Sequence, residues 1–78
     1  MTKTIITKQS ISHFKINDKQ IIIYLINGDS VCYKFKTQAE QVTIETELIK
    51  MMTTKTYTII VKYTKCSETE EKLEFFRF

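Results

Sequence analysis

Proline is absent from this chain of 78 residues, and glycine occurs once, at Gly28. Because stretches rich in these two residues mark linkers and breaks between domains, their scarcity predicts a single domain over residues 1–78. Loops that cradle phosphate groups need several glycines for close backbone approach. The sequence therefore argues against nucleotide hydrolysis and against dinucleotide chemistry.

Histidine and cysteine are almost as scarce, since His13, Cys32 and Cys66 are the only residues of these types. A structural zinc site takes four such ligands at characteristic spacings, and neither cysteine belongs to a Cys-x-x-Cys pair. No sequence-local partner for acid–base or nucleophilic chemistry is evident for His13. We therefore expect no catalytic residue, no metal and no cofactor, and we expect that the protein is not an enzyme.

The chain also has no long hydrophobic run. Its longest uninterrupted apolar segment, Ile21–Ile26, is far shorter than the roughly 20 residues that cross a bilayer. Before Ile11 the only apolar pair is Ile5-Ile6, which does not form the hydrophobic region of a secretory signal. We expect a cytoplasmic protein without a membrane span. Its two cysteines are expected to be reduced there, and the alternative is a disulfide between them.

Lysine, isoleucine and threonine are abundant. Lysine outnumbers arginine eleven to one, and isoleucine and threonine occur twelve times each. We interpret this skew as the coding bias of an AT-rich genome, which would suit a phage or mobile-element protein. The apolar fraction of 42% with 27% charged residues is typical of a globular chain rather than a disordered one. A core this small supplies only about 3–5 kcal/mol of net stability, so such a domain often relies on a partner.

Residues 20–36 contain the clearest structural signal. Asn27-Gly28 separates two runs of β-branched and aromatic residues, which is the strongest short-range pattern for a β-hairpin. A two-residue type I′ turn there predicts that Tyr24 lies opposite Val31, Ile22 opposite Tyr33, and Gln20 opposite Phe35. The other face of the hairpin then carries Ile21, Ile23, Leu25 and Cys32.

Residues 38–52 fit two structures. Thr37 and Glu40 form a capping box, in which the hydroxyl accepts a hydrogen bond from a first-turn amide and the carboxylate reaches back. This pattern predicts a helix that is apolar over about half its circumference, although Glu45 intrudes on that face. Residues 41–50 also alternate polar and apolar side chains as a strand does. We favour the helix because the cap is specific and the segment is long for a strand.

Three further segments predict strands. Residues 9–16 and 55–65 alternate with a period of two, and residues 72–78 form an aromatic terminal strand. With the hairpin and the helix, the predicted fold is α+β: an antiparallel sheet in the order β-β-β-α-β-β with one helix on one face. The alternative is an all-β small barrel in which residues 41–50 form a strand.

One helix covers only one face of a sheet, so this fold leaves apolar side chains facing water. We expect an interface made by side chains of the central and terminal strands, namely Ile21, Ile23, Leu25, Phe75, Phe76 and Phe78. The predicted function is therefore that of a small non-catalytic interaction module, which forms a homo-oligomer or docks on a protein partner.

Nucleic-acid binding is the alternative function. Aromatic side chains beside lysines on a sheet surface stack bases in several small folds. The residues available for this are Lys15, Lys34, Lys36 and Lys62, with Tyr24 and Tyr33. A net charge of +3 and a single arginine are modest for a nucleic-acid footprint. We therefore rank nucleic acid below protein as the partner.

Overall fold

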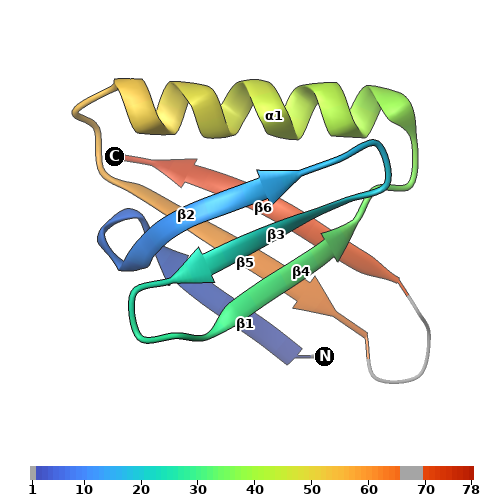
Figure 1. Ribbon diagram of the computed structural model, residues 1–78, viewed down its shortest axis with the longest axis horizontal. Coiled ribbons are helices and arrows are strands. Elements are labelled where there is room, and N and C mark those ends of the chain that lie inside the picture. Colours follow the sequence, from blue (N-terminus) through green and yellow to red (C-terminus); the bar gives the residue numbers. More distant parts are fainter. Residues whose placement is uncertain (1, 66–69) are drawn as a thin grey trace.

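The computed structural model describes residues 2–65 and 70–78. Within them the chain forms six strands, one 3₁₀ turn and one α-helix (Figure 1). In chain order these are β1 (Thr2–Thr7), η1 (Lys8–Ser10), β2 (Ile11–Ile16), β3 (Gln20–Leu25), β4 (Ser30–Lys34), α1 (Gln38–Thr53), β5 (Thr58–Thr64) and β6 (Glu71–Arg77). Cys66 and most of the predicted connection over residues 66–71 lie outside the described residues.

The strands form two antiparallel sheets of three strands each, with the orders β1-β5-β6 and β2-β3-β4. Figure 1 shows the β2-β3-β4 sheet in front of the β1-β5-β6 sheet, with the strands of the two sheets crossing and α1 along one side of both. The predicted α+β class and antiparallel pairing are confirmed, and the five predicted strands and the helix occur in the predicted order β-β-β-α-β-β, after one further strand at the start of the chain. Residues 41–50 lie in α1, and the sheets stay separate, so the barrel alternative is wrong.

β1 is a strand that the sequence did not predict, and it precedes the five predicted ones. Its segment contains a single apolar pair and no clear alternation, so a local pattern is missing. In the structure β1 pairs with β5, with Ile6 opposite Ile60. Ile6 is buried and Ile5 is exposed, because successive residues of a strand point to opposite faces. β5 and β6 thus join β1 in a sheet of their own.

The start of α1 agrees with the predicted capping box. Thr37 is the N-cap, and its side-chain oxygen accepts a hydrogen bond from the Glu40 amide at 3.1 Å. Glu40 Oε1 accepts two hydrogen bonds, from the Lys36 amide at 2.9 Å and from the Tyr33 hydroxyl at 2.8 Å. The same carboxylate therefore caps the helix and ties it to β4.

The buried face of α1 is narrower than the sequence predicts. It consists of Ile44, Leu48 and Met51, whereas Val42 and Ile49 are exposed. α1 lies along the side of the two sheets (Figure 1), so only one stripe of the helix reaches the core.

The hairpin between β3 and β4 closes one residue earlier than predicted. The Leu25 amide donates to the Asp29 carbonyl at 2.8 Å, and the Gly28 amide donates to the Leu25 carbonyl at 3.1 Å. Only Gly28 has a positive φ, of 96°, so the type I′ turn, which needs two such residues, does not form. The Asn27 side chain instead accepts from the Asp29 amide at 2.9 Å. This three-residue loop makes the predicted pairing of Tyr24 with Val31 wrong, since Tyr24 lies opposite Ser30.

This register changes which side chains share a face. Ile21 lies opposite Tyr33, and Ile23 lies opposite Val31. Ile21 is 0% exposed and Ile23 is 1% exposed, while Leu25 packs partly buried against the core. The prediction that these residues form an exposed interface is wrong, because the second sheet of the same chain covers them.

The core lies between the two sheets and α1. Its buried side chains are Ile6, Ile21, Ile23, Tyr33, Ile44, Leu48, Met51 and Ile60. Two ion pairs tie the surrounding elements together, one between Lys62 and Glu71 at 3.3 Å and one between Arg77 and Glu47. The core is therefore complete within one chain, and a candidate interface has to be sought on the outer faces.

Candidate interaction surface

The side of the β1-β5-β6 sheet that is turned away from the other sheet is called the outer face here. Ile6 and Ile60 point into the core, so their neighbours along the strands point outward. The register sets these outward residues in three rows across the sheet, which are Thr7, Ile59 and Phe76, then Ile5, Val61 and Glu74, then Lys3, Tyr63 and Lys72.

One end of the outer face is aromatic. The rings of Tyr57 and Phe78 lie 6.3 Å apart, and the Phe78 amide donates to the Tyr57 carbonyl at 2.9 Å. Tyr57 and Phe76 are each 39% exposed, Ile5 is 64% exposed and Phe78 is 73% exposed. Within the described part of the chain, no element packs over these side chains to complete their burial. They form an apolar patch on a sheet that is already packed on its other side.

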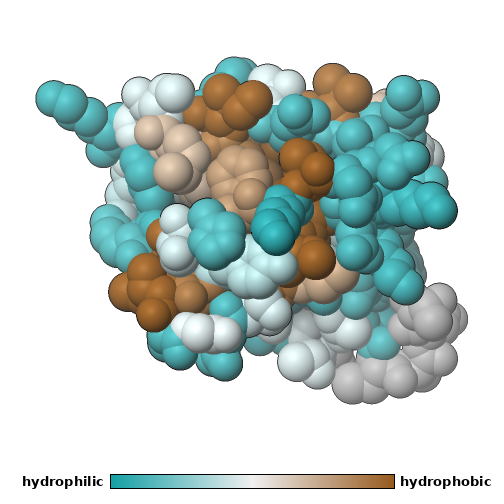
Figure 2. Space-filling model, viewed as in Figure 1, coloured by the Kyte–Doolittle hydropathy of each residue, from teal (hydrophilic) through white to brown (hydrophobic). Residues whose placement is uncertain are grey.

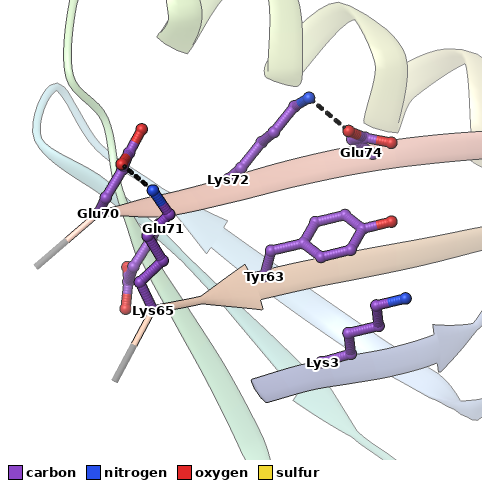
Figure 3. Close-up of a pocket in the computed structure, with 7 residues that line it drawn as sticks. All are labelled: Lys3, Tyr63, Lys65, Glu70, Glu71, Lys72 and Glu74. Atoms are coloured by element: carbon purple, nitrogen blue, oxygen red, sulfur yellow. Dashed lines mark ion pairs between the residues drawn. The ribbon is translucent and has the colours of Figure 1, made fainter. Parts of the chain in front are cut away.

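The opposite end of the outer face is charged. Figure 3 shows Lys3, Tyr63 and Lys72 side by side on three neighbouring strands. Lys3 Nζ lies 5.5 Å from the centre of the Tyr63 ring. Lys72 Nζ lies 2.6 Å from Glu74 Oε1, and this hydrogen bond raises the pKa of the Lys72 amine above its ordinary value.

These residues line a shallow hollow of about 370 Å³ together with Lys65, Glu70 and Glu71. Lys65 and Glu70 are 3.1 Å apart, and this hydrogen bond lowers the pKa of Glu70. Three lysines and three glutamates balance, so the hollow does not select a ligand by charge. The arrangement suits contact with a surface better than capture of a small ion.

The aromatic residues of the terminal segment divide between the two sides of β6. Phe75 points inward and packs against the core, whereas Phe76 and Phe78 belong to the exposed aromatic end. β6, which includes the predicted terminal strand, lies at the edge of its sheet. Of the six predicted interface residues, only Phe76 and Phe78 lie together on an exposed apolar surface.

Sequence reasoning missed the part of this surface that β5 contributes. The alternation of residues 55–65 sets Tyr57, Ile59 and Val61 on one face of the strand and the residues between them on the other. The structure turns the other face inward, where Thr58 and Ile60 are both fully buried. The contrast between the two faces of β5 was the signal, but it did not say which face a second sheet would cover.

The predicted nucleic-acid residues are only partly brought together. Lys15, Tyr24 and Lys34 share the exposed side of the β2-β3-β4 sheet. The rings of His13 and Tyr24 stack there with centres 4.5 Å apart and planes 14° apart, and Lys15 Nζ lies 5.9 Å from the Tyr24 ring. Figure 2 views the molecule from this side and shows hydrophobic and hydrophilic residues mixed, with hydrophilic ones gathered at the right.

Two of the other predicted nucleic-acid residues, Tyr33 and Lys62, do not join this surface. Tyr33 is buried, and its burial and its hydrogen bond to Glu40 raise the pKa of the phenol. Lys62 pairs with Glu71 and donates to the Cys32 carbonyl, so its charge is already used within the chain. Lys36 lies beyond the end of β4, and its backbone amide donates to Glu40 Oε1 at the helix cap.

The described residues, 2–65 and 70–78, contain no cluster of three histidine, cysteine or acidic side chains that could hold a metal ion. No helix among them is both long enough and apolar enough to cross a membrane. Comparison with known proteins gives no match to a family model, to a curated protein or to a solved structure.

Proposed function

We propose that this protein is a non-catalytic interaction module that self-associates through the outer face of its β1-β5-β6 sheet. The observation that carries this proposal is the exposed group of Ile5, Tyr57, Phe76 and Phe78 on one side of a sheet whose other side completes the core. Contiguous apolar patches of this kind on small proteins mark binding surfaces. Every copy of the chain carries the same patch, and a twofold contact needs only one self-complementary surface.

The size of the patch fits a weak dimer. A whole aromatic side chain presents roughly 150–250 Å², so the exposed fractions of these four residues correspond to about 400 Å² per copy. Homodimer interfaces are about 65% apolar. Two patches supply about 800 Å² of apolar surface. If this is about 65% of the interface, the whole interface buries about 1,200 Å², which is the lower limit for specific association. We expect a dissociation constant in the micromolar range.

The free edge of β4 is a less favourable route to association. Cys32 lies opposite Ile22 in a pair that does not exchange backbone hydrogen bonds, so its carbonyl points to the free edge of β4. Lys62 donates to this carbonyl, and a charge placed on an edge in this way discourages another strand from pairing there. The edge of β6 stays available, and the experiments below separate edge pairing from contact between outer faces.

Solution mass tests the proposal. Light scattering of the unmodified chain should show a mass that rises from 9.3 kDa toward twice that value up to hundred-micromolar concentration. Ile5→Lys should keep the mass at that of the monomer, because it places a charge inside the interface. Val42→Lys is the matched control, since Val42 is 57% exposed on α1, and it should associate as the unmodified chain does. A monomeric mass for the unmodified chain throughout would overturn the proposal.

Nucleic-acid binding is the second candidate, and the His13–Tyr24 stack beside Lys15 is the observation that favours it. We rank it lower because two lysines supply few phosphate contacts, and affinity scales with their number. Titration with a single-stranded oligonucleotide at physiological salt should show no binding. A micromolar complex that Tyr24→Ala abolishes would reverse this ranking.

We place the protein in the cytoplasm, where the exposed free thiol of Cys32 stays reduced.

A further inference from the structure

The two ends of the outer face differ in their side chains, and this difference restricts how two copies fit together. At one end lie the rings of Tyr57, Phe76 and Phe78, and at the other end Lys3 and Lys72 flank Tyr63. We propose, resting on the function above, that the partner is a second copy whose strands run antiparallel to those of the first. The charged end of each copy then covers the aromatic end of the other.

Two twofold arrangements bring the outer faces of two copies together with their strands aligned. If the axis runs parallel to the strands, each row stays level with the same row of the partner, and β1 lies over the partner's β6. Lys3 then meets the partner's Lys72 at two equivalent places, and Ile5 meets the carboxylate of the partner's Glu74. Like charges in a partly desolvated interface repel. The two lysine–lysine contacts therefore make this arrangement unfavourable.

If the axis lies across the strands, each strand faces its own copy in the opposite direction. Lys72 on β6 then lies against the ring of the partner's Phe78. A lysine amine over an aromatic face is attracted by the ring quadrupole. Tyr63 lies against the partner's Tyr57, which forms an aromatic pair on each side of the axis. In the middle rows Ile59 lies against the partner's Val61, and Phe76 lies against the partner's Glu74, whose carboxylate keeps its ion pair with Lys72.

The charge of Lys72 is compatible with this position. Its amine is already paired with Glu74 at 2.6 Å, so the ion pair is desolvated as a unit rather than as a lone charge. Lys3 likewise lies over the Tyr63 ring of its own chain. A twofold contact of this kind uses each patch fully, so it closes as a dimer and leaves no surface on which a third copy would add.

The two arrangements predict opposite effects of removing the lysine charge. Lys72→Ala should weaken the dimer by about tenfold in the antiparallel arrangement, since two equivalent cation–π contacts are lost. It should strengthen the dimer in the parallel arrangement, since two lysine–lysine contacts are relieved. Lys72→Arg should retain the affinity, and Lys34→Ala, on the exposed side of the other sheet, is the matched control. Sedimentation equilibrium measures all four dissociation constants, and Lys72 is exposed enough that none of these changes should disturb folding.

Cross-linking gives an independent readout of the geometry. In a background of Cys32→Ser and Cys66→Ser, the single variants Tyr57→Cys and Tyr63→Cys are mixed in equal amounts and treated with a bis-maleimide reagent, whose arm spans the roughly 10 Å between facing sheets. The antiparallel arrangement predicts cross-linked dimers that contain one chain of each variant, which mass spectrometry distinguishes from dimers of one variant alone.

Each outcome decides between specific claims. Cross-linking of each variant mainly with itself, or a dimer that tightens with Lys72→Ala, would overturn the antiparallel arrangement and leave self-association intact. A dimer unaffected by Lys72→Ala and Phe78→Ala would show that association uses another surface, such as the β6 edge. A chain that stays monomeric would overturn the proposed function itself.

Discussion

Thr58 is the only fully buried polar side chain among the described residues, and its hydroxyl has no hydrogen-bond partner there. A buried hydroxyl without a partner costs its desolvation free energy, whereas an apolar group of the same shape does not. Thr58→Val should therefore raise the free energy of unfolding by about 1 kcal/mol, as measured by urea denaturation. A loss of stability would show that the hydroxyl forms a hydrogen bond to a buried water.

Gly28 matters for its backbone conformation alone. Its φ of 96° is one that side-chain-bearing residues rarely adopt, and a β-carbon built there would meet no atom within 4 Å. Gly28→Ala should destabilise the fold by about 1 kcal/mol, entirely through this backbone cost. Gly28→Asn should cost less, because asparagine tolerates positive φ better than alanine does. Thermal unfolding of the two variants compares them directly, and equal costs would contradict this explanation.

At the scale of the elements, the cap of α1 should contribute measurably to stability. Thr37→Ala removes the acceptor for the Glu40 amide and should cost about 1 kcal/mol of unfolding free energy. Thr37→Ser keeps an acceptor oxygen and should cost much less. Urea denaturation of both variants tests this, and an equally large loss in Thr37→Ser would mean that the methyl group, rather than the hydroxyl, stabilises the helix start.

The contact between β4 and α1 should make stability depend on alkaline pH. Burial, then the hydrogen bond to Glu40, raises the pKa of Tyr33 above its ordinary value of 10.0. Above pH 10 the unfolded chain loses the phenolic proton while the folded chain keeps it, so the free energy of unfolding falls as pH rises. The slope reaches at most about 1.4 kcal/mol per pH unit. Tyr33→Phe removes this contribution, so the difference between the two chains should shrink above pH 10, and a constant difference would contradict it.

The elements also show what a sequence reveals and what it leaves undetermined. α1 was predictable because its cap is a local pattern in Thr37 and Glu40. The β3–β4 register was not predictable, because the register depends on whether Asn27 adopts a positive φ. The hydrogen bond from the Asp29 amide to the Asn27 side chain holds Asn27 at a negative φ. β1 lacks any local signal, and only its pairing with β5 makes it a strand.

For the whole molecule, the candidate surface was predictable in kind but not in place. The reasoning that one helix leaves a sheet face uncovered holds, but the uncovered face belongs to β1, β5 and β6. Alternation along a strand separates two faces without saying which one the rest of the chain will cover. Ile21 and Ile23 therefore lie in the core, and Ile5, which no local pattern singles out, lies on the candidate interface.

We propose that two copies meet at the outer face of the β1-β5-β6 sheet, and amide NMR spectra recorded over a dilution series show whether they do. Lowering the concentration from the hundred-micromolar range should shift the amide signals of β1, β5 and β6, with the largest changes around Ile5, Ile59 and Phe76. Signals from the exposed side of β2-β3-β4, such as that of Tyr24, should stay in place. Spectra that do not change with concentration, or changes confined to β2-β3-β4 or to α1, would contradict the claim.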